Sequence, residues 1–257
     1  MRWTLVQEEE ARPGWYNMAV DMALLELSAR HGEGFLRLYQ WTPHCLSFGR
    51  HEPAVKRYDR DTIAALGLDV VRRPTGGRAV WHGRELTYAV TAPTEAFGPL
   101  PAAYRTIHQT LRRALADLGA DATLAPSPPR GRQHRLDAGA CFAQPVGGEI
   151  MVGGRKVVGS AQMRRGNVFL QHGSVLLDDD QRMVARVTRG DPPDGTEAPL
   201  NRLLGTPVAA GDLADAIAAT ARHWTGEWLE DDRKDERAEV AAVHSGRFRS
   251  SEWTWHR

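Results

Sequence analysis

Residues 72–82 read Arg-Arg-Pro-Thr-Gly-Gly-Arg-Ala-Val-Trp-His, and residues 85–90 continue as Glu-Leu-Thr-Tyr-Ala-Val. The two valines at 70–71 are typical of a strand end, and Pro74 stops that strand. The glycine pair at 76–77 permits a turn with positive φ that brings backbone amides close to a ligand. Residues 85–90 have the composition and alternation of the strand that leaves the loop. The flanking arginines and histidine make this loop a candidate site for an anionic or carbonyl-bearing ligand.

The flanking chain mixes helices and strands without strict alternation. Asn17 is the expected N-cap of a helix that runs to about Arg30, and a strand is expected at 35–41. A packing helix should end at Gly119. Further strands separated by glycine turns are expected at 149–152, 155–163 and 167–177. This order predicts an α+β fold with a largely antiparallel or mixed sheet flanked by helices.

Composition excludes several classes of protein. The net charge of +1 argues against a general nucleic-acid binder, which normally has a clear basic excess. No run of eighteen apolar residues is present, so we expect no membrane span. Cys45 and Cys141 are the two cysteines, too few for a disulfide framework, and a reducing cytoplasm is the expected location. In its apolar context, Cys45 is expected to be a small buried hydrophobe.

Three separated motifs resemble one family. They are the 72–88 segment, the sequence GRKVVGSAQ at 154–162 followed by LQHGS at 170–174, and Cys141-Phe142 with Pro145 and Glu149. In this order they resemble the lipoate-protein ligase and octanoyltransferase family, which shares its catalytic domain with biotin ligases. The third motif resembles the cysteine-dependent octanoyltransferase branch. That pattern has an aromatic residue before the glutamate, where this chain has Val146-Gly147-Gly148, so we expect a looser turn.

The resemblance implies a single catalytic domain over 1–257, with its core at about 15–225 and a variable tail at about 226–257. Within it, residues 231–257 alternate charge and are expected to be surface structure or a frayed end. The ligase branch carries an extra C-terminal domain, and we expect none within these 257 residues.

Two catalytic residues are implied by the same resemblance. Cys141 is the expected nucleophile, because one thioester can replace another without ATP. Lys156 is expected to reach the acyl carbonyl, where it would stabilise the oxyanion or act as a base toward the incoming amine. The sequence leaves both roles for Lys156 open.

The remaining site residues are expected to bind the acyl group and its thioester end. They are Arg73, Thr75, Gly76, Gly77, Arg78, His82, Gly159, Ser160, Ala161, His172 and Gly173. We expect the two histidines to orient loops through hydrogen bonds rather than to transfer protons. The sequence contains no Cys-x-x-Cys and no His-Glu-x-x-His, so we expect neither metal nor cofactor.

The function implied is octanoyl transfer from an acyl carrier protein, through Cys141, to a lysine of a lipoyl domain or of the glycine-cleavage H protein. One alternative is an ATP-dependent lipoate-protein ligase, which would need ATP and Mg²⁺; the Cys141-Phe142 segment, which the ligase branch generally lacks, argues against it. A transferase that moves octanoyl or lipoyl groups between two carrier domains would carry similar residues. The alternative from another class is a non-catalytic protein that binds an acyl group or its carrier.

Overall fold

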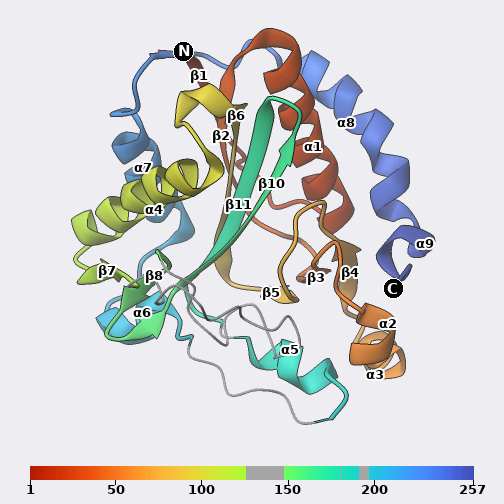
Figure 1. The fold of residues 1–257 in the computed structure, drawn as a ribbon. Helices are drawn as coiled ribbons and strands as arrows, with labels where there is room; N and C mark the ends of the chain where they lie inside the picture. Colours follow the sequence, from red (N-terminus) through yellow and green to blue (C-terminus); the bar gives the residue numbers. More distant parts are fainter. Residues whose placement is uncertain (126–147, 180, 191–196) are drawn as a thin grey trace, which may run out of the picture.

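A six-stranded mixed sheet forms the centre of the computed structural model, which describes residues 1–125, 148–179, 181–190 and 197–257 (Figure 1). The strand order is β10-β11-β6-β2-β1-β12. β1 pairs in parallel with β2 and β12, and the other pairs are antiparallel. The strands are β1 Arg2–Gln7, β2 Gly34–Tyr39, β6 Glu85–Pro93, β10 Val158–Arg165, β11 Val168–Leu176 and β12 Glu227–Leu229. The predicted α+β class with a mixed sheet is confirmed.

Two three-stranded sheets carry the motifs. The first, ordered β4-β3-β5, holds the glycine loop between β4 and β5. The second, ordered β7-β8-β9, carries Lys156 on its last strand. Their strands are β3 Cys45–Phe48, β4 Asp69–Arg72, β5 Val80–His82, β7 Ala122–Leu124, β8 Ile150–Val152 and β9 Arg155–Lys156.

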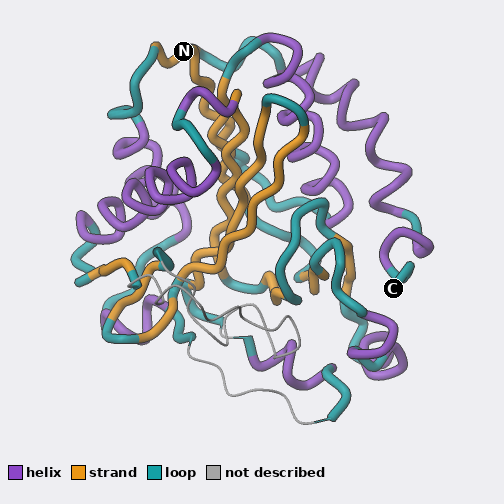
Figure 2. Tube along the Cα trace, in the orientation of Figure 1, coloured by secondary structure: helices purple, strands orange, loops and turns teal. Residues whose placement is uncertain are grey.

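Helices cover both faces of the central sheet (Figures 1 and 2). α1 (Gly14–His31) and α8 (Lys234–Arg249) lie over one face, and α4 (Leu100–Asp117) and α7 (Ala210–Ala221) over the other. Successive side chains of a strand point to opposite faces. On β2, therefore, Phe35 and Tyr39 pack in the cluster of α1, whereas Leu36 and Leu38 pack in that of α4.

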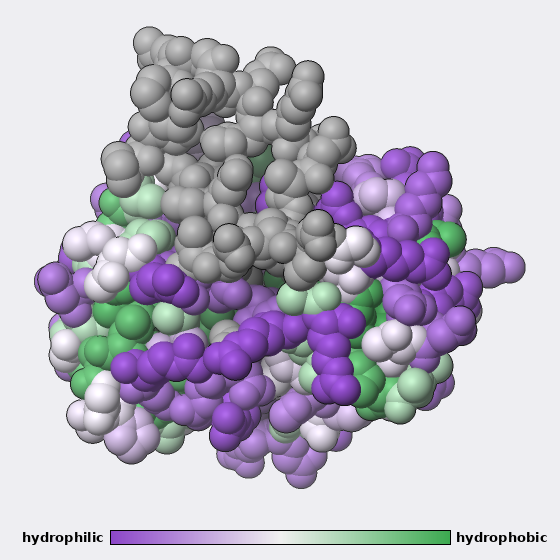
Figure 3. Space-filling view, turned by 90° about the horizontal axis from the view of Figure 1, so that it is seen from below, coloured by the Kyte–Doolittle hydropathy of each residue, from purple (hydrophilic) through white to green (hydrophobic). Residues whose placement is uncertain are grey.

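Shorter helices lie at the periphery of the two layers. They are α2 Ala54–Arg57, α3 Arg60–Ala65, the 3₁₀ helix η1 Thr94–Ala96, α5 Arg182–Val187, α6 Leu200–Leu204 and α9 Ser251–Thr254. Within the described ranges, no helix combines the length and apolarity needed to cross a membrane. Where the described residues form the surface seen from below, it is mostly hydrophilic, with apolar side chains in scattered groups (Figure 3).

One local expectation is wrong. Asn17 does not cap α1, because the helix begins at Gly14 with Pro13 as its N-cap. Instead the buried Asn17 side chain donates to the carbonyl oxygens of Arg12 and Gln40. Of the two alternatives expected for 231–257, the structure shows a surface element rather than a frayed end, because α8 packs along α1.

Candidate active site

The loop between β4 and β5 is joined to β3 by the buried Arg73, which donates to the carbonyl oxygen of Ser47 at 2.7 Å and to that of Arg78 at 2.8 Å. The neighbouring Arg72, also buried, donates to the carbonyl oxygen of Gly49 at 2.7 Å, in the segment that follows β3. The two guanidinium groups thus stabilise the loop and the segment that faces it, because they satisfy backbone carbonyl groups that would otherwise be buried without a donor.

A glycine opposite the loop allows the close approach. A Cβ at Gly49 would lie 1.8 Å from the carbonyl oxygen of Gly77, so only glycine fits. Gly77 itself has a φ of 89°, which a side chain would strain. The expected positive-φ turn is therefore present at the second glycine of the 76–77 pair.

His172 joins the loop to the central sheet. Its Nε2 lies 2.6 Å from Thr75 Oγ1, and its Nδ1 lies 2.8 Å from Asp21 Oδ2. Asp21 also accepts hydrogen bonds from Arg37 and Tyr39 at 2.9 Å each. Burial alone would raise the pKa of Asp21, but the hydrogen bond from His172 and the charge of Arg37 hold it below its usual value. The buried Asp21 carboxylate therefore orients the His172 ring, and the ring holds the loop through Thr75. Hydrogen bonds of this kind are what we expected of His172.

His82 occupies the equivalent place at the other end of the loop. Its Nε2 lies 2.7 Å from Ser47 Oγ, and its ring stacks on Trp41 with centroids 3.9 Å apart. Its Nδ1 lies 3.5 Å from Glu85 Oε1, beyond good hydrogen-bond distance. Burial lowers the pKa of His82, which favours the neutral ring.

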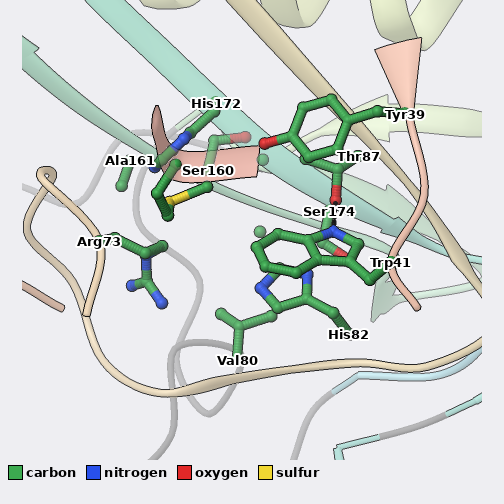
Figure 4. Close-up of a pocket in the computed structure, with 13 residues that line it drawn as sticks. Tyr39, Trp41, Arg73, Val80, His82, Thr87, Ser160, Ala161, His172 and Ser174 are labelled. Atoms are coloured by element: carbon green, nitrogen blue, oxygen red, sulfur yellow. Dashed lines mark hydrogen bonds between the residues drawn. The ribbon is translucent and has the colours of Figure 1, made fainter. Parts of the chain in front are cut away.

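A small apolar pocket lies between the loop and the strands (Figure 4). It contains about 330 Å³ of unfilled space, part of which is open to solvent. Arg73 lies across the pocket from Trp41 and His82 (Figure 4). The lining residues are Met18, Tyr39, Trp41, Arg73, Val80, His82, Thr87, Gly159, Ser160, Ala161, His172, Gly173 and Ser174.

Most of the expected binding residues meet at this pocket. Seven line it, and Thr75 adjoins it through His172. Gly76, Gly77 and Arg78 belong to the loop but are not among the lining residues. The cysteine motif with Cys141 lies outside the described residues.

Lys156 is fully buried on β9. Its Nζ lies 2.5 Å from Glu149 Oε1, and both side chains are almost inaccessible to solvent. Lys156 precedes Gly159, the first wall residue of β10, by three positions. Its charge lies close enough to His108 to help lower the pKa of that ring, after the larger effect of burial, and His108 contacts Ser160 of the pocket wall.

His108 of α4 is the residue that sequence reasoning missed. Its ring nitrogens lie 2.6 Å from the carbonyl oxygen of Gly148 and 2.9 Å from Ser160 Oγ. The signal available was a histidine on the apolar face of a helix, next to Ile107. Glu149 was noted in the cysteine motif without a role, and the structure gives it one as partner of Lys156.

No candidate metal site is found in the described part of the chain, where groups of three or more histidine, cysteine, aspartate or glutamate side chains suited to an ion are absent. Hydrogen bonds instead join His82, His172 and Ser160 of the pocket to Ser47, Thr75 and His108 outside it.

Comparison with known proteins identifies related sequences. A family model described as the lipoyl protein ligase A/B catalytic domain matches residues 13–220. The chain is 39% identical over 262 aligned positions to octanoyltransferase LipM of Kyrpidia tusciae, with 94% of each chain covered. It is 41% identical over 187 positions to octanoyltransferase LipM of Staphylococcus aureus, covering 69% of this chain and 67% of that one.

Solved structures share the fold. The putative lipoate protein ligase Ta0514 of T. acidophilum with bound lipoic acid superposes with a TM-score of 0.79 and 21% identity, covering 99% of this chain and 100% of that one. Lipoate-protein ligase A bound with ATP also gives 0.79 and 21%, covering 99% and 98%. At this identity the two structures establish a common fold and nothing finer.

Proposed function

The chain belongs to the lipoyl protein ligase A/B catalytic domain family, and from this premise we propose that it is an octanoyltransferase of protein lipoylation. Octanoyltransferase relatives that align over 94% of both chains support the reaction class. The structural observation that carries the proposal is the buried Lys156–Glu149 pair, which is linked through His108 to Ser160 in the wall of an apolar pocket. An acyl chain needs apolar walls, and its reacting carbonyl needs a fixed charge.

We propose a two-step transfer through Cys141. The Cys141 thiolate attacks the thioester carbonyl of an octanoyl-carrier protein, and the carrier thiol leaves. The ε-amine of a lysine on a lipoyl domain or the glycine-cleavage H protein then attacks the new thioester, loses a proton and releases Cys141. Each step replaces one bond to the acyl carbon by another, so ATP is not consumed.

Lys156 and the pocket residues have separate roles in this proposal. The apolar walls hold the methylene chain. As the cation of a buried pair, Lys156 stabilises the negative charge that develops on the carbonyl oxygen in each step. His172 and His82 keep the loop closed against the pocket through Thr75 and Ser47.

The second candidate is an ATP-dependent lipoate-protein ligase, because the solved structures that share this fold include lipoate ligases. A ligase starts from a free carboxylate, which must be activated as an acyl-adenylate before an amine can attack it. The two reactions therefore differ in their energy source.

The test is a paired assay on the purified protein with a lipoyl domain as acceptor. Octanoyl-carrier protein without ATP or Mg²⁺ should yield octanoylated domain with ping-pong kinetics. Free octanoate or lipoate with ATP and Mg²⁺ should yield little or no product. Modification that requires ATP would establish the ligase instead, and binding of octanoyl-carrier protein without turnover in either assay would indicate a non-catalytic binder.

A further inference from the structure

His108 lies on α4 with its ring fully buried between two segments that are distant in sequence. Its Nδ1 is 2.6 Å from the carbonyl oxygen of Gly148, and its Nε2 is 2.9 Å from Ser160 Oγ. Ser160 lines the pocket, and Gly148 directly precedes Glu149, the partner of Lys156. One imidazole therefore touches both the pocket wall and the segment that holds the buried ion pair.

The protonation of this ring follows from its partners. A carbonyl oxygen accepts only, so Nδ1 carries the hydrogen. Burial lowers the pKa of His108 to about 4, and the charge of Lys156 acts in the same direction, so the ring is neutral at ordinary pH. Nε2 is then an acceptor, and Ser160 Oγ donates to it.

The hydroxyl of Ser160 is fixed by a second partner. Gln171 Nε2 donates to the Tyr88 hydroxyl at 2.8 Å, and this hydroxyl, 2.7 Å from Ser160 Oγ, donates onward. Every hydrogen in this chain of bonds has an assigned acceptor. The pocket wall at Ser160 thus has no hydroxyl hydrogen directed at an acyl chain.

The hydrogen bond from His108 to Gly148 bears more directly on the reaction than the bond from Ser160. Gly148 has a φ of 88°, and its amide donates to the carbonyl oxygen of Ala125 at 2.8 Å. The Ala125 amide in turn donates to the carbonyl oxygen of Glu149 at 2.7 Å. These bonds and the bond from His108 fix the backbone from which the Glu149 carboxylate reaches Lys156.

We propose that His108 is a positioning residue: through Gly148 it holds Glu149 where its carboxylate sets the position of the Lys156 ammonium. This inference rests on the proposed function for its reaction, but its geometry does not depend on which acyl donor is used. A buried histidine that only filled the core would contribute stability and nothing specific to turnover.

Two isosteric substitutions separate the two ends of the ring. The Asn amide nitrogen lies near the place of Nδ1, so His108→Asn keeps the donor to Gly148 and loses the acceptor for Ser160. The Gln amide oxygen lies near the place of Nε2, so His108→Gln does the reverse. His108→Leu removes both, and Thr110→Val on the same helix is the matched control, because it removes the acceptor of a buried hydrogen bond from Trp224 that lies away from Gly148.

The expected result is a pattern in kcat at nearly constant donor KM. His108→Leu and His108→Gln should lower kcat roughly 10- to 100-fold, the scale of a small misplacement of a catalytic group. His108→Asn should recover most of that loss, and Thr110→Val should retain wild-type kcat although it is destabilised. Equal kcat in all four variants, or losses in kcat that follow urea stability alone, would overturn the proposal.

The wild-type enzyme separates this proposal from the proposed function. Absence of ATP-independent transfer by the wild type would refute the function, and the variant ratios would then be measured in the ATP-dependent reaction. A readout without turnover is amide hydrogen exchange at Ala125 and Gly148. His108→Leu and His108→Gln should accelerate it by up to about tenfold, the scale of one lost hydrogen bond, whereas His108→Asn should not. Unchanged exchange in His108→Leu would contradict the proposal even for an inactive protein.

Discussion

Removing the charge from one member of the Lys156–Glu149 pair should destabilise the protein far more than removing both. Nζ and Oε1 are 2.5 Å apart, and relative side-chain exposures are 0% and 5%. Breaking such a buried pair removes the opposite charge from a group inside the protein and typically costs about 3–5 kcal/mol. In a chain of this size, each kcal/mol shifts Tm by about 2–4 °C, so Lys156→Met or Glu149→Gln should lower Tm by about 6–20 °C.

The double variant Lys156→Met/Glu149→Gln removes both charges of the pair. We expect it to be more stable than either single variant, with a coupling free energy on the order of 3 kcal/mol in a double-mutant cycle. Urea unfolding followed by circular dichroism measures each free energy. Single-variant losses that simply add would show that the two side chains are not coupled, and the argument from burial would be refuted.

Among the two single variants and the double variant, kcat should not follow the free energy of unfolding. Lys156→Met should lower kcat by a factor on the order of 10² to 10³, the scale of losing one oxyanion donor, and the double variant should remain as slow. Turnover is compared below the melting temperature of the least stable variant. Near-wild-type turnover of Lys156→Met would make the pair a structural element only.

Three further perturbations test other parts of the site. The pKa of His108 is lowered to about 4, so the folded protein holds this ring neutral. Its contribution to the free energy of unfolding, on the order of 3 kcal/mol, is complete above about pH 6.5 and is lost as the pH falls toward 4. Urea titrations at several pH values should show this loss in the wild type and not in His108→Asn. Gly173→Ala would place a Cβ 2.5 Å from the carbonyl oxygen of Gly159, so it should cost about 1–3 kcal/mol and reduce octanoyl transfer, whereas Gly211→Ala, where no atom lies within 4 Å, should not. Exposed Arg165 lies close enough to Arg247 for its charge to lower the pKa of Arg247, after the larger effects of burial and of Arg50. These neighbouring cations should attract an acidic carrier protein, so Arg165→Glu should slow turnover of a carrier-bound donor at low salt. Turnover of octanoyl-pantetheine, which has no carrier protein, should be unaffected.

Local sequence patterns were sufficient for most of the fold. Glycine turns and apolar alternation predicted strands at 155–163 and 167–177, where β9 and β10 and then β11 are found. The loop between β4 and β5 was predicted for the same reason, because proline and glycine act on their own neighbourhood. Seven of the eleven expected binding residues line one pocket.

The partners of these residues could not be predicted in the same way. His172 contacts Asp21 across 151 positions, and His108 contacts Gly148 across 40. Asn17 was expected as a cap because asparagine favours that position. Its side chain instead bonds to Arg37, so a tertiary contact overrides the local preference. The sequence left two alternatives for 231–257, and a contact between distant residues decides between them, since the carbonyl oxygen of Thr254 accepts from Arg72, 182 positions away.

Cysteine reactivity distinguishes the two thiols of the chain. Cys45 is fully buried, as expected, and burial together with neighbouring Asp69 raises its pKa well above the usual value. A thiol in that state is a poor nucleophile. Any acyl group that the protein accepts from a thioester should therefore be carried by Cys141.

The most direct test of this account is the intact mass of the protein after incubation with octanoyl-carrier protein in the absence of ATP. We predict the addition of one octanoyl group that hydroxylamine removes, that is retained in Cys45→Ser and that is absent in Cys141→Ser. An adduct lost in Cys45→Ser but kept in Cys141→Ser would contradict the account, as would lipoylation that requires ATP and survives Cys141→Ala.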